Sequence, residues 1–207
     1  MKREKVIETI NGLSGAAGHK KVLEVYNSQK NLPRGYKVQP KDHWCAATVS
    51  AVFLLNGCDI FSECSCIQMV EKAKKANIWQ ENDGYKPKPG DVVLYDWDDS
   101  GKGDNKGQPD HVGIIIKSTD TNFTVREGNK NGTIGNREMK VDGKYIRGFI
   151  CPKYTEEKKK TVKDIALEVI AGKWGKGEAR KQKLKVAGYD PVKVQAKVNE
   201  ILKGEKK

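Results

Sequence analysis

The hydrophobic pattern of the chain changes once along its length, and that change limits the folds open to it. In the first part, apolar side chains recur at helical spacing in residues 1–30, in a run that Asp42-His43-Trp44-Cys45 opens and Asn56-Gly57 ends, and in residues 67–76. Further on, the pattern becomes short β-like runs between glycine and polar turns, in residues 91–95, 111–117, 122–129 and 145–150. Helices that precede a group of strands, rather than alternating with them, predict an α+β domain built on an antiparallel sheet.

A segment without apolar side chains divides the chain into two unequal parts. Residues 155–161 read Thr-Glu-Glu-Lys-Lys-Lys-Thr, cannot contribute to a core and are predicted to be a linker. Residues 1–154 are sufficient for one ordinary domain. In residues 162–207 helical spacing returns three times, with breaks at Gly172 and Gly188. This second part is predicted to be a small three-helix bundle, near the lower size limit for independent folding.

The chain is basic, and the excess charge is concentrated in the second part. The formal net charge is +12 over 207 residues. Residues 155–207 hold fifteen Lys and Arg against eight Asp and Glu, a surplus of seven. A basic surface attracts polyanions such as nucleic acids, anionic lipids or phosphate-bearing wall polymers. Because no aromatic side chains interleave with the basic ones as in nucleic-acid-binding motifs, we expect no nucleic acid partner.

The sequence shows no pattern typical of a membrane or secreted protein. No apolar stretch approaches the roughly 20 residues that span a bilayer. The first residues are charged but are not followed by an apolar block and a cleavage site, so no secretory signal peptide is expected. We therefore expect synthesis in a cytoplasm and no membrane partner.

Five cysteines are present, at positions 45, 58, 64, 66 and 151. Their odd number and irregular spacing predict mostly free thiols rather than a disulfide framework. Cys58, Cys64 and Cys66 could hold a metal ion together with one histidine. Zinc sites, however, usually separate paired cysteines by two to four residues, and only Ser65 lies between the last two. Packing of small side chains around a turn is the preferred interpretation, and we predict no metal centre.

Cys45 occupies a position where a thiol gains reactivity. It lies in the first turn of a predicted helix that ends at Gly57 and has Asp42 or His43 as its cap. Unpaired N–H groups and the macrodipole at a helix N-terminus stabilise a thiolate. The same N–H groups can receive the oxyanion of a tetrahedral intermediate. A nucleophile of this kind also needs a base.

His111 is the candidate base among three histidines, because it opens a strand directly after a long Gly/Asp loop. Across the predicted hairpin, the start of this strand faces the end of the next one. Glu127 and Asn129 are predicted to share the strand face of Phe123 and Val125, where either can orient the imidazole. The same residue types also occur together without a catalytic role, so the pattern alone leaves catalysis and packing both open.

Four short motifs follow one another along the first part. They are Asp42-His43-Trp44-Cys45, Pro89-Gly90-Asp91-Val92-Val93, Asp110-His111-Val112-Gly113-Ile114-Ile115 and Glu127-Gly128-Asn129. In order and spacing they resemble the CHAP family of cysteine, histidine-dependent amidohydrolases and peptidases, over nearly all of residues 20–154. The resemblance implies a papain-like fold, with Cys45 as nucleophile and His111 as general base and then acid. It further implies that Glu127 orients the imidazole, that Asn129 is an additional polar member, and that the substrate is peptidoglycan.

The second part carries motifs of its own. They are Ile165-Ala166, Gly172-Lys173-Trp174-Gly175, Gly177-Glu178-Ala179-Arg180, Ala187-Gly188-Tyr189-Asp190, Val194-Gln195 and Val198-Asn199. Together they resemble the Cpl-seven-type cell-wall-binding repeat appended to some phage lysozymes and endolysins, which binds the peptidoglycan muropeptide. The resemblance implies wall-binding roles for Trp174, Arg180, Tyr189 and Asp190. By chemistry alone, the two aromatic rings can either stack on sugars or fill a small core.

An acidic loop resembles half of a calcium-binding motif. Asp96-Trp97-Asp98-Asp99-Ser100-Gly101 and Asp104 begin like such a loop, but Gly107 stands where a bidentate glutamate is needed. A solvated acidic loop beside the cleft is the preferred interpretation. We expect no required cofactor, and calcium stays open as an alternative.

The two resemblances imply a phage endolysin, a peptidoglycan hydrolase that we expect to accumulate in the host cytoplasm and then to act on a cell wall, expected to be of the Gram-positive type. The alternatives are a general papain-like cysteine protease, a non-enzymatic basic binding protein and, as a different origin for the same activity, a bacterial autolysin. Cleavage by an N-acetylmuramoyl-L-alanine amidase and by a stem or cross-bridge endopeptidase are both compatible with the sequence.

Overall fold

A computed structural model describes residues 1–82, 84–98, 106–155 and 160–204 of the chain. The chain divides into two compact units, Met1–Glu156 and Glu157–Lys207, and each has its own cluster of buried apolar side chains. The predicted linker at residues 155–161 includes residues 156–159, which lie outside the described part. Across the described residues, no helix combines the length and apolar character that crossing a bilayer requires.

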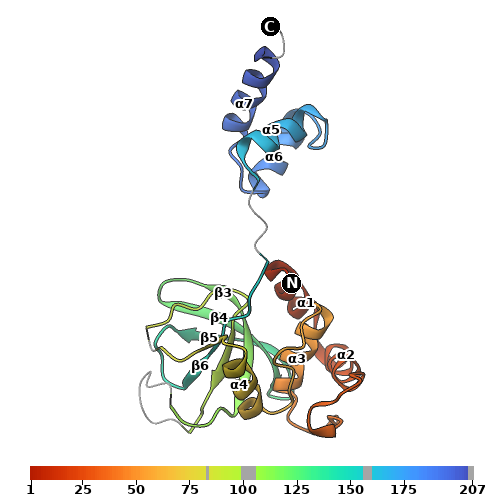
Figure 1. Ribbon diagram of the computed structural model, residues 1–207, viewed down its shortest axis with the longest axis vertical. Helices are drawn as coiled ribbons and strands as arrows, with labels where there is room; N and C mark the ends of the chain where they lie inside the picture. The colour runs from red at the N-terminus through yellow and green to blue at the C-terminus, as the bar shows by residue number, and fades with distance from the viewer. Residues whose placement is uncertain (83, 99–105, 156–159, 205–207) are drawn as a thin grey trace. The chain divides into compact units, whose positions relative to one another are not determined.

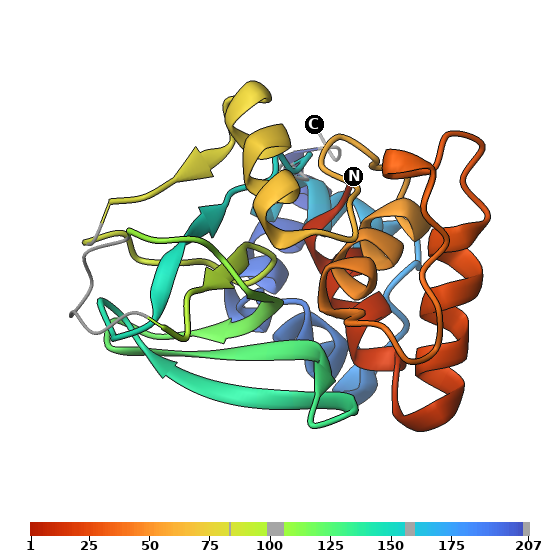
Figure 2. The same cartoon turned by 90° about the horizontal axis from the view of Figure 1, so that it is seen from below.

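The first unit begins with helices, as the spacing of its apolar residues predicts. They are α1 (Arg3–Gly12), α2 (Gly15–Asn27), the short 3-10 helix η1 (Pro33–Gly35), α3 (Cys45–Leu55) and α4 (Cys66–Lys75). Every residue of α3 from Cys45 to Phe53 is buried, because apolar and small side chains cover all faces of this helix. Figures 1 and 2 show α1 and α2 beside α3, on one side of the strands. The central helix of this unit is therefore α3.

The strands of the first unit form one antiparallel sheet with the order β1-β6-β2-β3-β4-β5. They are β1 (Trp79–Gln80), β2 (Val92–Tyr95), β3 (His111–Ser118), β4 (Asn122–Lys130), β5 (Thr133–Lys140) and β6 (Ile146–Ile150). The predicted α+β fold with an antiparallel sheet is confirmed. Strands β1 and β5 were not predicted, because β1 has only two residues and Ile134 is the only buried one of the eight residues of β5.

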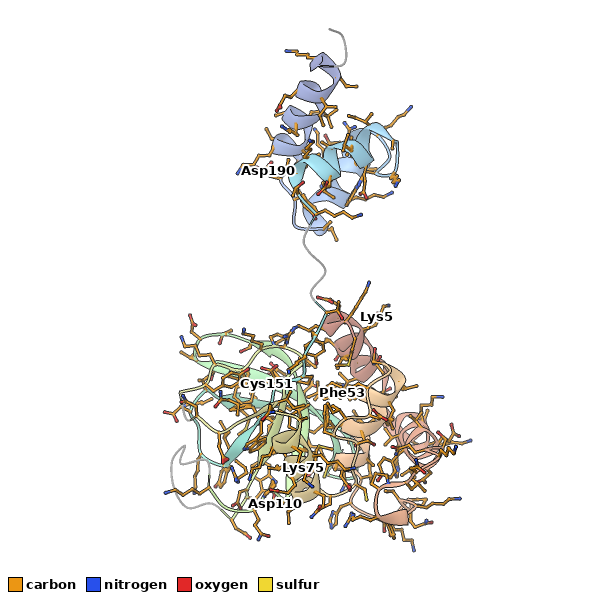
Figure 3. All side chains as sticks on the ribbon, in the orientation of Figure 1. Lys5, Phe53, Lys75, Asp110, Cys151 and Asp190 are labelled. Carbon is orange, nitrogen blue, oxygen red and sulfur yellow. The ribbon has the colours of Figure 1, made fainter. Side chains whose placement is uncertain are left out.

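Apolar side chains cover both faces of the sheet. One set packs with the helices and comprises Val92, Leu94, Val112, Ile114 and Ile150. The residues that alternate with them form a second cluster of Val93, Tyr95, Ile115, Phe123, Val125, Ile146 and Phe149. This division follows from the two-residue period of a strand. Phe53 of α3, labelled in Figure 3, belongs to the first cluster. Burying each large apolar side chain contributes about 1.5–3 kcal/mol.

The second unit contains the three predicted helices, α5 (Val162–Ile170), α6 (Gly177–Val186) and α7 (Pro191–Gly204). Thr161 and Asp164 cap α5 reciprocally, since the side chain of each accepts a hydrogen bond from the backbone N–H of the other. The small core is formed by Ile165, Ala166, Val169, Leu184, Val194 and Val198. A core of this size stabilises a unit only modestly.

The central helix approaches strand β4 closely at Gly128. A Cβ atom at this position would lie 1.9 Å from the hydroxyl oxygen of Thr48 on α3, far inside van der Waals contact. Thr48 is itself held in place, because its hydroxyl donates a hydrogen bond to the Trp44 carbonyl at 2.8 Å. Glycine at position 128 therefore allows the helix to lie against the sheet.

We predict that Gly128→Ala lowers the free energy of unfolding by about 1–3 kcal/mol, the usual effect of overpacking a core. Urea denaturation followed by circular dichroism measures this change. Gly12→Ala is the matched control, because a Cβ there meets no atom within 4 Å and its effect is expected to be neutral or slightly stabilising. Equal stability of the two variants would show that the close approach at Gly128 is not a constraint.

Candidate active site

Cys45 is the first residue of the central helix, as the sequence predicts. The residue before the helix is Trp44, and among the described residues no side chain caps the helix start. The predicted cap was wrong, because the Asp42 carboxylate instead accepts hydrogen bonds from the Gln39 N–H and the Tyr36 hydroxyl, each at 2.7 Å. The N–H groups of the first turn are therefore not taken up by a capping side chain.

His111 is the first residue of β3 and lies opposite Tyr95 of β2. Its Nε2 atom is 3.3 Å from Oε2 of Glu127 on β4, as predicted from the hairpin. Glu127 is fully buried. Its carboxylate also accepts two hydrogen bonds from Arg137 of β5, at 2.6 Å from Nε to Oε1 and 3.0 Å from Nη2 to Oε2. Arg137 was not predicted, because the strand that carries it was not recognised.

Cys45 and His111 shift each other's pKa. A hydrogen bond with Cys66, contact with His111 and the Ala46 N–H together lower the pKa of Cys45 well below that of an ordinary thiol, although burial opposes this. Burial by itself lowers the pKa of His111, but its contacts with Cys45 and Glu127 outweigh that effect and raise the pKa to about 9. At neutral pH these directions favour a thiolate beside an imidazolium.

The buried carboxylate is also kept charged. Burial raises the pKa of Glu127, but the hydrogen bonds from His111 and Arg137 more than compensate and lower it. Cys45, His111, Glu127 and Arg137 thus form a row of alternating negative and positive charges. Opposite charges about 4 Å apart attract each other by roughly 4 kcal/mol at the effective dielectric constant of a protein surface.

A second thiol lies beside the first. Sγ of Cys66, the first residue of α4, is 3.9 Å from Sγ of Cys45, and both residues are buried. The hydrogen bond with Cys45 and burial raise the pKa of Cys66 well above its usual value, so Cys66 stays protonated and donates to Cys45. Cys64 instead accepts a hydrogen bond from Nη2 of Arg34 at 3.1 Å. Cys64 and Cys66 therefore have different partners rather than a shared one.

Asn129 does not occupy its predicted place beside Glu127. A bulge in β4 between Glu127 and Lys130 interrupts the alternation of side chains, and Asn129 has a positive φ of 56°. Its Nδ2 atom is 3.3 Å from Nδ1 of His43. Asn129 thus contacts the segment just before Cys45, and the prediction that it shares the strand face of Glu127 was wrong.

Two aromatic rings stack beside the imidazole. The ring centroids of Tyr95 and His111 are 5.7 Å apart, and those of Trp97 and Tyr95 are 4.8 Å apart. The backbone N–H of Trp97 donates a hydrogen bond to the Asp110 carboxylate at 3.0 Å. These rings restrict the orientation of His111. Neither was singled out from the sequence, because an aromatic residue in or beside a strand usually indicates core packing.

Three acidic side chains gather next to this site. Carboxylate oxygens of Asp96, Asp98 and Asp110 lie within 4.8 Å of one another, and oxygen ligands of this type suit calcium. The remaining acidic residues of the predicted half motif, Asp99 and Asp104, lie outside the described residues. The calcium alternative stays a prediction.

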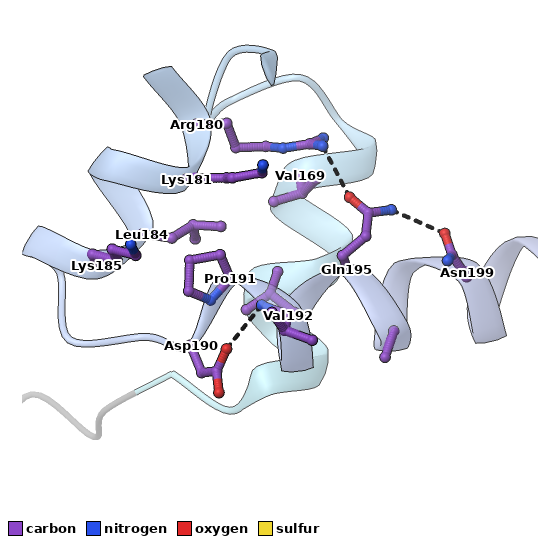
Figure 4. Close-up of a pocket in the computed structure, with 12 residues that line it drawn as sticks. Val169, Arg180, Lys181, Leu184, Lys185, Asp190, Pro191, Val192, Gln195 and Asn199 are labelled. Carbon is purple, nitrogen blue, oxygen red and sulfur yellow. Dashed lines mark hydrogen bonds between the residues drawn. The ribbon is translucent and has the colours of Figure 1, made fainter. Parts of the chain in front are cut away.

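The second unit has a pocket of about 550 Å³ between α6 and α7, and Arg180 and Asp190 line it. Nη2 of Arg180 donates to Oε1 of Gln195 at 2.9 Å, and Figure 4 shows these two side chains pointing toward each other. Asp190 accepts a hydrogen bond from the Val192 N–H at 2.8 Å and thereby caps α7. The pocket thus combines apolar walls with a guanidinium and an amide.

The two aromatic residues predicted for wall binding lie elsewhere in this unit. Trp174 and Tyr189 pack edge to face, with centroids 6.4 Å apart, and both are half-buried against the small core. Nε1 of Trp174 donates to Glu168 at 2.9 Å. Trp174 lines a different, more open hollow with Glu168 and Lys173. The structure therefore places Arg180 and Asp190 at one pocket and packs the two half-buried rings against each other, and the wall-binding roles of all four residues stay predictions.

Comparison with known proteins gives matches in both parts of the chain. Residues 35–129 match the CHAP domain, and residues 163–202 match the CW_7 repeat. Over 42 residues the chain is 55% identical to a lysozyme of Streptococcus phage Cp-7, a stretch that covers 20% of this chain and 12% of that protein. The chain thus contains a CHAP domain followed by a CW_7 repeat.

Proposed function

We propose that the chain is a peptidoglycan hydrolase of the endolysin type that cuts an amide bond with Cys45 as nucleophile. The observation that carries this proposal is the contact between Cys45, at the start of a buried helix, and His111, which Glu127 holds from the other side. The presence of a CHAP domain and a CW_7 repeat in one chain supports the same conclusion.

The proposed reaction has two steps. The Cys45 thiolate attacks the carbonyl carbon of the amide, and the resulting oxyanion is received by N–H groups at the start of α3. The imidazolium of His111 donates its proton to the departing amine, which leaves a thioester on Cys45. His111 then accepts a proton from water, which attacks the thioester and releases the acid and the thiolate. Glu127 orients the imidazole throughout and is not itself protonated.

Two kinds of amide bond in peptidoglycan fit this chemistry. One joins N-acetylmuramic acid to L-alanine, and the other lies within the stem peptide or the cross-bridge. Mass spectrometry of the released muropeptides distinguishes an amidase from an endopeptidase, because only the amidase separates the glycan strand from the whole peptide.

The second unit is proposed to hold the enzyme on the wall. Its pocket offers Arg180 and Gln195 as hydrogen-bonding groups and apolar walls from Val169 and Leu184, which suits a muropeptide. We propose peptidoglycan of a Gram-positive wall as the partner, rather than nucleic acid or membrane, and storage in the host cytoplasm before lysis. The thiolate chemistry requires no cofactor.

We predict that Cys45→Ala lowers the release of new ends from purified Gram-positive peptidoglycan by on the order of 10⁴-fold or more, because the nucleophile is lost. Binding to the same walls should be unchanged. Cys58→Ala is the control, since Cys58 is half-buried at the edge of the core. Clearing of cells by the Cys45 variant would refute the proposal, and cleavage of casein but not of peptidoglycan would identify a general protease.

The pH dependence follows from the pair of Cys45 and His111. Because the pKa of His111 is raised to about 9, the imidazolium that protonates the leaving amine is present below that pH and is lost above it. We predict that kcat/KM on a soluble muropeptide falls above about pH 9, with half of the plateau remaining near this pH. A decline centred near pH 6.5, the ordinary imidazole value, would contradict the assigned state of the pair.

We predict that Arg180→Ala weakens binding to purified walls by about tenfold or more, the effect of losing a hydrogen bond from a charged group. Sedimentation of labelled protein with walls measures this affinity. Lys203→Ala removes the same charge from an exposed position on α7 and is the matched control. An equal loss in both variants would indicate attraction by net charge alone and would contradict a role for the pocket.

A further inference from the structure

We propose that Arg137 is a positioning residue that competes with His111 for the carboxylate of Glu127 and so limits how strongly the imidazole holds its proton. This inference rests on the proposed function, in which His111 first gives up a proton and then takes one back. Arg137 does not touch the thiol, and its action passes through Glu127.

The geometry of the carboxylate carries the inference. Oε2 of Glu127 is shared, because it lies 3.3 Å from Nε2 of His111 and 3.0 Å from Nη2 of Arg137. Oε1 accepts a second hydrogen bond from Arg137, at 2.6 Å from Nε. A planar guanidinium that binds both oxygens fixes the plane of the carboxylate. It therefore fixes the direction from which Oε2 meets the imidazole.

Arg137 is itself held in place by the elements around it. It belongs to β5, whose residue Gly135 lies directly opposite Glu127, so Arg137 reaches the carboxylate from the diagonal position. Its guanidinium lies 4.7 Å from the ring centroid of Trp97 and 5.9 Å from that of Tyr95. Both rings also lie beside His111, Tyr95 stacked at a centroid distance of 5.7 Å and Trp97 tilted at 6.1 Å. One aromatic pair thus orients both partners of the carboxylate.

Charge explains why such a competitor is useful. A fully buried carboxylate with His111 as its only cationic partner would stabilise the imidazolium strongly, and the imidazole would then be slow to release its proton to the leaving amine. The guanidinium neutralises part of that negative charge and remains protonated at all working pH values. His111 can then act as an acid in the first step and as a base in the second.

The groups that face His111 come from several elements. They are Cys45 of α3, Glu127 of β4, Tyr95 of β2 and Asp110, which precedes His111 along the chain. Burial and Glu127 raise the pKa of Tyr95 well above its usual value, so its hydroxyl is neutral in the working range. Among the described residues that contact Glu127, Arg137 is the permanent cation. Replacing Arg137 therefore removes positive charge from beside the Glu127 carboxylate without removing a group that contacts Cys45.

The test is a titration of His111 by NMR in the full chain, which contains three histidines. The His111→Asn variant identifies the signal. We expect Arg137→Gln to raise the pKa of His111 by about one unit, because a neighbouring positive charge is removed. Glu127→Gln should shift it in the opposite direction. On a soluble muropeptide, Arg137→Gln should move the alkaline fall of activity upward and lower kcat on the order of 100-fold, as a misplaced catalytic group does.

Two further variants separate this role from a purely structural one. Arg137→Lys keeps the charge but not the planar fork, so the pKa of His111 should stay near the original value while kcat falls. Arg126 lies next to Glu127 on β4 and binds the Ile10 and Leu13 carbonyls instead, so Arg126→Gln should reduce stability without moving the titration. If Arg137→Gln does not fold, Arg137→Met, which keeps an unbranched side chain against the Trp97 ring but removes the charge, is titrated in its place, and the same upward shift of the pKa of His111 is expected.

A titration of His111 that is unchanged or shifted downward in Arg137→Gln overturns the inference. The proposed function fails separately, through the absence of peptidoglycan cleavage by the unmodified chain. Since the NMR titration needs no substrate, the two failures can be told apart.

Discussion

The packing of α3 against the sheet is the constraint on which the candidate active site depends. This helix is buried from Cys45 to Phe53, so its position is determined by contacts on every side rather than by one amphipathic face. Strand β4 comes so close to this helix at Gly128 that a side chain at position 128 would collide with Thr48. This contact brings the start of the helix to the edge of the sheet where β3 begins with His111 and where Glu127 lies near the end of β4.

The ionisable groups of this site are partly or fully buried, and burial disfavours the charged form of each. Moving a charge out of water is costly unless opposite charges and hydrogen bonds replace the lost solvation. Here each ionisable group has such a partner, since Cys45 contacts His111 and Glu127 lies between His111 and Arg137. Cys66 adds a thiol hydrogen bond to Cys45. The network as a whole, rather than one pair, favours the thiolate form of Cys45 in a largely apolar surrounding.

The second unit combines electrostatic attraction to anionic polymers with a pocket that offers hydrogen bonds. Its positive charge draws it toward anionic polymers at long range, an effect that salt screens. The pocket with Arg180 and Gln195 offers short-range hydrogen bonds instead. Under the proposed function, such a unit raises the local concentration of the catalytic unit at its substrate. A small core suits this role, because the unit needs only enough stability to present one pocket.

Local sequence patterns determined much of this protein. Helical spacing, β-like runs and glycine breaks report on neighbouring residues, so they predicted the helices, most of the strands, Cys45 at a helix start and His111 at a strand start. The hairpin connects β3 to β4 by a short turn, which is why the contact of His111 with Glu127 could also be predicted.

Contacts between segments that are distant in the sequence were decided only by the tertiary structure. Cys66 reaches Cys45 because the first residue of α4 lies beside the first residue of α3, and Arg137 reaches Glu127 through the register of an unrecognised strand. A bulge that no alternation pattern reveals turned Asn129 toward His43. The physical reason is the same in each case, since register and packing depend on the whole core, whereas a hydrophobic pattern records only the preference of each segment.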